Sequence, residues 1–284
     1  MFVGVDLGGT NVRAAIEVDG VIHSPRRNAF NTMGSLEDTL QELIDFIRPS
    51  IQRGVNGIGI GVPSVVDVEE GIVYNVMNIP SWERVPLKSI LEEAFSLPVR
   101  VNNDVNCFVL GEHRFGVLKG FHNVVGMACG TGLGLGVIIN DALYVGNNCG
   151  AGEIGLLPYL DHTLEYYASG NFFPALHGMT AKQANERAMG NDPVAREAWS
   201  QFGTHFAQAI KNVVLTFDPE AVVLGGSVSK AFPYFAESMM AALNDFPFGE
   251  SMKRLKIFRS QNENAALLGA AALLRGLNTE RTVA

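Results

Sequence analysis

The chain contains the same pattern twice: an apolar strand, a glycine-rich turn and a second apolar strand. Residues 3–10 (VGVDLGGT) align with residues 125–132 (VGMACGTG), and the alignment continues without a gap to Ile16 over Ile138. Because the pattern occurs only twice, it indicates two similar lobes and not a solenoid of many repeats. Two such hairpins that face each other would hold a chain of phosphate groups between them.

The glycines of these turns are typical of phosphate binding. Glycine is favoured where φ is positive or where the backbone closely approaches a ligand, and successive turn amides can then point at an anion. A third glycine turn, residues 224–227 (LGGS), lies between a predicted strand and a predicted helix. The alternative is a set of hairpin turns that bind nothing. The predicted phosphate-binding residues are Asp6, Gly8, Gly9, Thr10, Gly130, Thr131, Gly132, Gly225 and Gly226.

Only the first of the two hairpins carries a carboxylate before its turn. The second copy has Ala128 where the first has Asp6. A single carboxylate beside phosphate groups suits Mg²⁺, bound directly or through water. Other nucleotide motifs do not fit, because segment 130–136 continues as a strand where a dinucleotide-binding motif requires a helix, and the chain has no lysine-bearing P-loop.

Length and composition allow two α/β lobes. The chain has 284 residues, of which 47% are apolar and 18% charged, so a sizeable core can form. Predicted strands alternate with helices, which favours mostly parallel sheets with ligands at the carboxyl ends of the strands. The alternating glycines at 132, 134 and 136 predict a very close packing partner on one strand face. We expect strands over 3–7, 12–18, 57–62, 99–102, 220–225 and 255–259, helices over 35–53, 86–96, 180–189, 192–216, 229–244 and 264–276 and from about 104, and an irregular stretch over 145–178.

The predicted lobes are discontinuous in sequence. We expect a smaller lobe of residues 1–104 plus 265–284 and a larger lobe of residues 105–264, because the last helix returns to the first lobe.

Charge and cysteine content exclude several classes of protein. The net charge of -8 argues against a surface that binds nucleic acid or an anionic membrane. No apolar run reaches the roughly 18–20 residues of a membrane span, and no secretion signal is expected at the start of the chain. The three cysteines have no CxxC spacing, which fits the reducing cytoplasm.

Asn103 and Asp104 lie where a buried strand stops and a helix begins. A sugar hydroxyl is a poor nucleophile, so a positioned carboxylate such as that of Asp104 would accept its proton as it attacks a γ-phosphate. Asn103 could orient the sugar, because its amide both donates and accepts hydrogen bonds. The structural alternative for Asp104 is the helix N-cap.

Further polar residues are candidate sugar contacts. Glu153 follows a flexible glycine turn, Glu165 precedes Ser169 by four residues, and Asn78 lies in a short polar segment. Carboxylates and amides suit a sugar because each of its hydroxyls both donates and accepts. The alternative is that the two glutamates are solvated surface acids.

These motifs, in this order, resemble those of the ROK family of repressors, open reading frames and sugar kinases, over almost the whole chain. Residues 103–106 (NDVN) are similar to the family's NDAN segment, whose aspartate is the catalytic base. The other matching segments are 6–10 and 130–134, which resemble the two phosphate motifs, 151–155, which resembles AGExGH, and 224–226, which resembles the nucleotide-side turn.

The resemblance implies the duplicated α/β fold of actin-like (ribonuclease H-like) ATPases, with two lobes that close on a sugar and Mg-ATP. It implies phosphate transfer to a sugar hydroxyl, usually on C6, with Asn103, Asp104, Glu153 and Glu165 on the sugar, and a homodimer. Glucose is the first expectation. N-acetylmannosamine, N-acetylglucosamine, fructose and allose are alternative sugars, and polyphosphate is an alternative donor.

The chain departs from the family pattern around residue 156. The family usually has a histidine that touches the sugar at the end of AGExGH, followed by a cysteine-rich zinc loop. Here Leu156 takes that position, and residues 157–164 contain no cysteine. We therefore expect no zinc site, and a loop held by packing of Leu156, Leu157, Tyr159 and Leu160. A smaller departure is Asn102, where the family often has glutamate.

Three other functions would require different sequence features from those of a sugar kinase. Repressors of this family carry a helix-turn-helix region before the first phosphate motif, for which no room is expected before Val3. A non-catalytic sugar sensor would be expected to lose Asp104 or the phosphate turns. An acyl kinase would need no general base, because its carboxylate substrate is already ionised.

Overall fold

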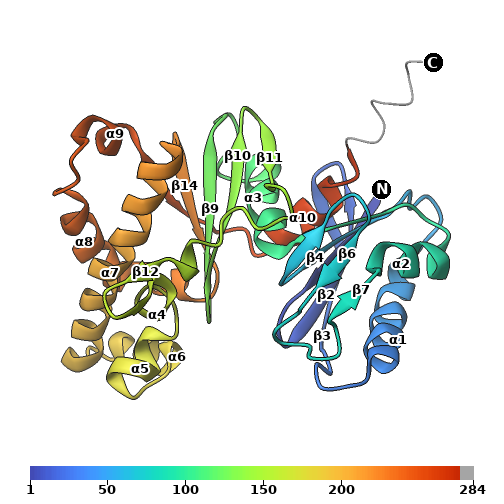
Figure 1. Cartoon of the computed structure of the whole chain (residues 1–284), viewed down its shortest axis with the longest axis horizontal. Helices are drawn as coiled ribbons and strands as arrows, with labels where there is room; N and C mark the ends of the chain where they lie inside the picture. The colour runs from blue at the N-terminus through green and yellow to red at the C-terminus, as the bar shows by residue number, and fades with distance from the viewer. Residues whose placement is uncertain (276–284) are drawn as a thin grey trace.

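The computed structural model describes residues 1–275, which form two five-stranded sheets with the same strand order (Figure 1). In each sheet three strands form an antiparallel meander, and two further strands run parallel to the first strand of the meander. The first sheet has the order β3-β2-β1-β4-β8, with β1 Phe2–Leu7, β2 Asn11–Val18, β3 Val21–Ala29, β4 Ile58–Val62 and β8 Val99–Asn103. The second has the order β11-β10-β9-β14-β15, with β9 Val124–Cys129, β10 Leu133–Ile139, β11 Ala142–Tyr144, β14 Ala221–Gly225 and β15 Lys256–Arg259.

The repeat is confirmed, but its ungapped alignment is wrong across the turn. Leu7 pairs with Val12, whereas Cys129 pairs with Leu133, so the second hairpin has a turn that is one residue shorter. Because side chains alternate between the two faces of a sheet, a one-residue slip would exchange the faces of a whole strand. The equivalence of the two hairpins therefore needs a one-residue gap in the turn.

Two helices cross between the sheets. Helix α3 (Asp104–Phe115) follows the first sheet in sequence but packs on β9 and β10 of the second. Helix α10 (Ala265–Ala272) follows the second sheet but packs on β1 and β4 of the first. In Figure 1 both helices lie between the two sheets. This exchange fits the expectation that the last helix returns to the first lobe. The boundaries of the two lobes stay a prediction. Residues 276–284, which were assigned to the smaller lobe, lie outside the described part of the chain.

Glycines allow these helices to touch their neighbours through the backbone. A Cβ atom added to Gly269 would lie 1.7 Å from the carbonyl oxygen of Cys107, and one added to Gly111 would lie 1.9 Å from that of Ala265. Helix α10 also contacts its own sheet in this way, since a Cβ at Gly59 would lie 1.8 Å from the carbonyl oxygen of Ala270. No side chain fits at these contacts, so α3, α10 and β4 approach one another more closely than residues with side chains would allow.

The predicted close packing on the alternating glycines is also confirmed. A Cβ at Gly136 would lie 2.5 Å from Val109 Cγ1, and one at Gly134 would lie 3.1 Å from Val105 Cγ2. Both valines belong to α3, so the bare face of β10 receives the helix that begins with Asp104.

The remaining elements surround this centre. Most of the expected helices are present within a few residues of their predicted bounds. The stretch 145–178, expected to be irregular, contains short elements, and strands β3 and β5–β7 were not predicted. The further elements are α1 Leu36–Ile47, β5 Val65–Asp67, β6 Ile72–Tyr74, β7 Arg84–Val85, α2 Leu87–Phe95, β12 Pro158–Tyr159, β13 His162–Thr163, α4 Leu164–Ala168, α5 Phe172–His177, α6 Ala181–Met189, α7 Pro193–Phe217, α8 Phe232–Leu243 and α9 Gly249–Arg254. Within residues 1–275 no helix has both the length and the apolar character that crossing a bilayer requires.

The contact between α3 and α10 can be tested with one methyl group. Gly269→Ala should destabilise the protein by about 1–3 kcal/mol or more, because the clashing atoms belong to the backbone and cannot move aside. For a chain of this size that lowers Tm by roughly 2–4 °C per kcal/mol in thermal unfolding. Gly249→Ala is the matched control, since nothing lies within 4 Å of the added Cβ. Equal Tm values for the two variants would contradict the packing described.

Candidate active site

A cavity of about 790 Å³ lies where the carboxyl ends of strands from both sheets meet. Its walls include Asp6 from β1, Ala128 from β9, Gly225 from β14 and Arg259 from β15, together with Asp104 after β8. A ligand in this cavity would therefore contact both lobes at the edge where parallel strands commonly bind ligands.

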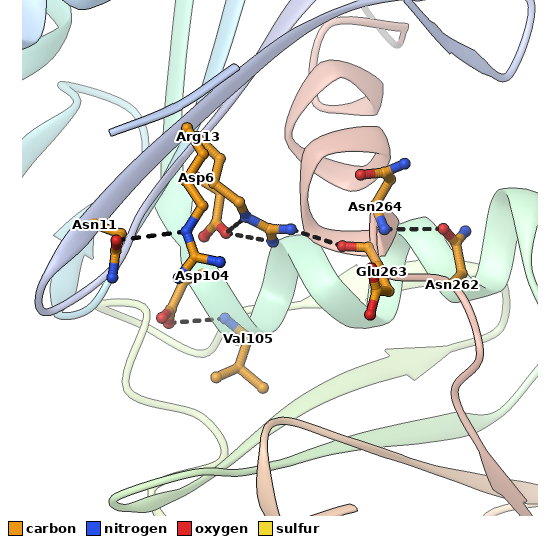
Figure 2. Close-up of polar contacts among 9 residues, drawn as sticks. Asp6, Asn11, Arg13, Asp104, Val105, Asn262, Glu263 and Asn264 are labelled. Carbon is orange, nitrogen blue, oxygen red and sulfur yellow. Dashed lines mark hydrogen bonds and ion pairs between the residues drawn. The ribbon is translucent and has the colours of Figure 1, made fainter. Parts of the chain in front are cut away.

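The carboxylate of Asp104 is held at the first position of α3. The N-cap of that helix is Asn103, whose Oδ1 accepts hydrogen bonds from the amides of Val105 (2.8 Å) and Asn106 (3.3 Å). The alternative that Asp104 is the N-cap is therefore wrong. Asp104 Oδ1 accepts from the Val105 amide as well, at 2.9 Å (Figure 2). The cap fixes the backbone of Asp104 while its carboxylate faces the cavity.

The environment of Asp104 raises its pKa to about 7, from an ordinary value of 3.8. Burial is the largest cause, because it disfavours the charged form, and the negative charge of Asp6 is the next. The charge of Glu153 adds to both. A carboxylate that titrates near neutral pH is well matched to accept a proton from a substrate.

The side-chain amide of Asn103 forms most of its hydrogen bonds with other groups of the protein. Its Oδ1 caps α3, and its Nδ2 donates to the carbonyl oxygen of Ser64 at 3.3 Å. Within residues 1–275, the second N–H of this amide has no hydrogen-bond partner. Its sequence neighbour Asn102 is buried, with Oδ1 accepting from Asn106 Nδ2 (2.9 Å) and Cys149 Sγ (3.2 Å). Asn102 thus supports the strand end that carries Asp104.

Asp6 has an ion-pair partner that was not predicted. Arg13 lies directly opposite Asp6 in the β1–β2 hairpin, and its Nε (2.9 Å) and Nη2 (2.6 Å) both donate to Asp6 Oδ2. Its Nη1 donates to the carbonyl oxygen of Glu263 at 2.7 Å, as Figure 2 shows. The hairpin register would have revealed this pair, because opposite charges that face each other across two strands attract.

The surroundings of Asp6 fit a Mg²⁺ ion in part. Hydrogen bonds in the described part of the chain engage its Oδ2 and leave Oδ1 without a partner. Mg²⁺ commonly takes one or two protein carboxylates and completes its shell with phosphate oxygens and water. Asp6 could therefore hold the ion through Oδ1, with a nucleotide supplying other ligands.

The first phosphate turn lies beside the main cavity. Gly8 and Thr10 line a smaller cavity of about 240 Å³ that shares Asp6 and Arg13 with the larger one. A Cβ at Gly9 would lie 2.7 Å from Asn78 Nδ2, so the predicted sugar contact Asn78 lies against this turn.

The second and third glycine turns lie next to each other. Gly225 and Gly226 line the main cavity, and a Cβ at Gly226 (φ +82°) would lie 2.2 Å from the carbonyl oxygen of Cys129. The turn of Gly130, Thr131 and Gly132 begins at the next residue. It is braced by the Gly170 amide and the Ser169 hydroxyl, which donate at 2.7 Å to the carbonyl oxygens of Gly130 and Thr131.

Glu165 and Glu153 are two further acidic residues near the site, in addition to Asp6 and Asp104. Glu165, on α4, accepts a hydrogen bond at Oε2 from the Leu133 amide at 3.3 Å, and the same oxygen would lie 2.9 Å from a Cβ at Gly132. Loss of water around its carboxyl group raises the pKa of Glu153, and the charge of Glu165 raises it further. The carboxyl groups of Asp104 and Glu153 therefore both lie within range of a neighbouring negative charge, which raises the pKa of each.

The loop after Glu153 is not held as expected. Leu156 is 62% exposed, Leu160 is 68% exposed, and Leu157 is also exposed, so packing of these leucines does not hold the loop. Of the four predicted residues Tyr159 does pack against the core, and a small β12–β13 hairpin and a hydrogen bond of 3.1 Å between Tyr159 Oη and His205 Nδ1 also hold the loop. In residues 1–275 no three His, Cys, Asp or Glu side chains are grouped so that they could hold a metal ion.

Comparison with known proteins agrees with this architecture. The model of the ROK family matches residues 2–276. An N-acetyl-D-glucosamine kinase from Pectobacterium atrosepticum is 31% identical over 264 residues, covering 81% of this chain and 84% of the relative. A xylose repressor from Bacillus subtilis is 26% identical over 296 residues, covering 96% of this chain and 76% of the relative.

A solved structure extends the comparison to three dimensions. The crystal structure of a ROK family glucokinase from Streptomyces griseus, in complex with glucose and AMPPNP, matches with a TM-score of 0.83 at 28% identity and covers 97% of this chain and 99% of that one. The two lobes have the actin-like ATPase fold, as the sequence predicted. With the family model matching almost the whole chain, this protein belongs to the ROK family.

Proposed function

We propose that this protein transfers the γ-phosphoryl group of ATP to a sugar hydroxyl, with Asp104 as the general base. The observation that carries the proposal is the position of Asp104 on the wall of the cavity that Asp6 also lines, where burial and the negative charges of Asp6 and Glu153 raise its pKa to about 7. A carboxyl group whose pKa lies near neutral pH is about half ionised there, and its carboxylate form is a stronger base than that of an ordinary aspartate.

The reaction would proceed by in-line displacement. As the sugar oxygen attacks the γ-phosphorus, Asp104 takes the hydroxyl proton, the new oxygen–phosphorus bond forms, and the bond to the leaving ADP oxygen breaks. Amides of the glycine turns would bind the phosphate oxygens, and Asn78, Asn103, Glu153 and Glu165 would orient the sugar. A Mg²⁺ ion held by Asp6 would supply positive charge to the phosphate oxygens.

The expected substrate is a hexose, with glucose and its 6-hydroxyl as the first choice. This choice is supported by the likeness to a glucokinase and to an N-acetyl-D-glucosamine kinase. N-acetylglucosamine, N-acetylmannosamine, fructose and allose are the alternatives. Because Leu156 stands where the family usually has a sugar-binding histidine, the preference of this chain is expected to differ from that of a typical member.

A second candidate function is sugar sensing without catalysis. The likeness to a xylose repressor favours it, since that relative matches 96% of this chain. The two functions differ in one respect that can be measured: a sensor binds sugar but releases no ADP from ATP.

The substrate prediction is tested by ADP release with Mg-ATP and a panel of sugars. The panel contains glucose, mannose, fructose, allose, xylose, N-acetylglucosamine and N-acetylmannosamine, with a reaction lacking sugar as the control. At least one hexose should raise ADP release well above the control. A folded protein that binds a sugar yet is inactive with all of them would favour the sensor.

The role of Asp104 is tested by the nearly isosteric variant Asp104→Asn. Without a base, kcat should fall by about 10²–10⁴-fold, while affinity for the nucleotide stays close to that of the wild type. Glu83→Gln, in an exposed loop away from the cavity lining, controls for the loss of one carboxylate. Turnover of Asp104→Asn near the wild-type rate would show that the base is assigned wrongly.

The raised pKa of Asp104 also predicts a pH-dependent stability. Because the folded state raises this pKa from 3.8 to about 7, the folded protein binds the proton more tightly than the unfolded chain. The contribution of Asp104 to the free energy of unfolding is therefore largest at low pH and decreases as the pH rises from about 4 to about 7. Asp104→Asn should match the wild type near about pH 4 and have the higher Tm at about pH 8. An unchanged Tm difference between these pH values would contradict the pKa assigned.

A further inference from the structure

Arg13 is held in a fixed orientation beside the proposed base. Its guanidinium donates twice to Asp6 Oδ2 and once to the carbonyl oxygen of Glu263, at distances of 2.6–2.9 Å. The side chain of Arg13 is 28% exposed and that of Asp6 is 17% exposed. A guanidinium has five N–H donors, so three engaged here leave two for a ligand.

The location of Arg13 is shared by both cavities. It lines the main cavity together with Asp104, and the smaller cavity together with Gly8 and Thr10 of the first phosphate turn. A phosphate chain that passes from this turn toward Asp104 would therefore pass the guanidinium.

Other cations of the main cavity are held differently. Lys230 pairs with Glu263 at 3.4 Å where both side chains are exposed, and Arg27 has a long hydrogen bond of 3.4 Å to Asn11 Oδ1. Within residues 1–275 the guanidinium of Arg259, on the cavity wall, has no hydrogen-bond or ion-pair partner. Arg13 is braced on two sides by a carboxylate and a backbone carbonyl. A cation that is oriented in advance loses little entropy when it binds charge that develops during the reaction.

We propose that Arg13 binds the transferring phosphoryl group and stabilises its charge, and that Asp6 orients Arg13 for this task. The inference rests on the proposed function and extends it. The equatorial oxygens of a phosphoryl group in transfer carry negative charge, and an arginine supplied from the same chain can neutralise it. Since ADP lacks this group, Arg13 should strengthen the binding of ATP and not that of ADP.

The test compares Arg13→Gln and Arg13→Lys with the wild-type protein. Arg13→Gln should lower kcat by about 10²–10³-fold, and weaken ATP binding by at least about tenfold while the Kd of ADP stays within about twofold. Arg13→Lys keeps a charge beside Asp6 but loses the planar fork, so it should fold like the wild type and still lose most of kcat. Arg53→Gln is the control, because Arg53 is exposed near the opposite end of β4.

Nucleotide affinities are measured by calorimetry with ATP and with ADP, each with and without Mg²⁺. A Kd ratio of ADP to ATP that falls in both Arg13 variants supports the proposal, even if no sugar in the panel is phosphorylated and the proposed kinase activity fails. Equal weakening of both nucleotides, or an unchanged ratio with normal kcat, would overturn it. A wild-type protein that binds neither nucleotide would overturn the proposal and the kinase together.

Discussion

Direct contact between the backbones of α3 and α10 joins the two lobes. Gly111 and Gly269 bring the two helices together without intervening side chains, and Gly59 does the same for α10 and its sheet. Because each helix follows one sheet in sequence and packs on the other, the chain crosses twice between the lobes at this point. Any change in the angle between the lobes must therefore be accommodated at the helix crossing.

The same arrangement creates the electrostatics of the candidate site. The first residue of α3 is Asp104, and the segment that leads into α10 supplies the carbonyl of Glu263 that orients Arg13. Asp104 is kept away from water and close to Asp6, which raises its pKa, whereas Asp6 itself is paired with Arg13. Two aspartates near each other are thus given different environments: the carboxyl group of Asp104 is buried, whereas that of Asp6 is paired with a guanidinium.

Much of the fold and part of the candidate site could be predicted from local sequence pattern. The two glycine hairpins, the strand that ends at Asn103 and the close packing on Gly134 and Gly136 follow from turn chemistry and from periodicity. Predictions failed where the outcome depends on register or on distant contacts. The one-residue gap between the hairpins depends on strand pairing, and the Asp6–Arg13 pair depends on the register within the first hairpin. The leucines after Glu153 look like a core in sequence, but the surrounding structure leaves them exposed.

The proposed mechanism requires Asp104 to accept the proton of the sugar hydroxyl. The most direct test is the pH dependence of kcat/KM for the best sugar in the wild-type protein, compared with Asp104→Asn. If Asp104 is the base, log(kcat/KM) of the wild type rises with pH and levels off above a pKa of about 7. The residual activity of Asp104→Asn should not show this rise with pH. A wild-type profile that is flat between about pH 5 and 8, or a rise that persists in Asp104→Asn, would contradict this mechanism.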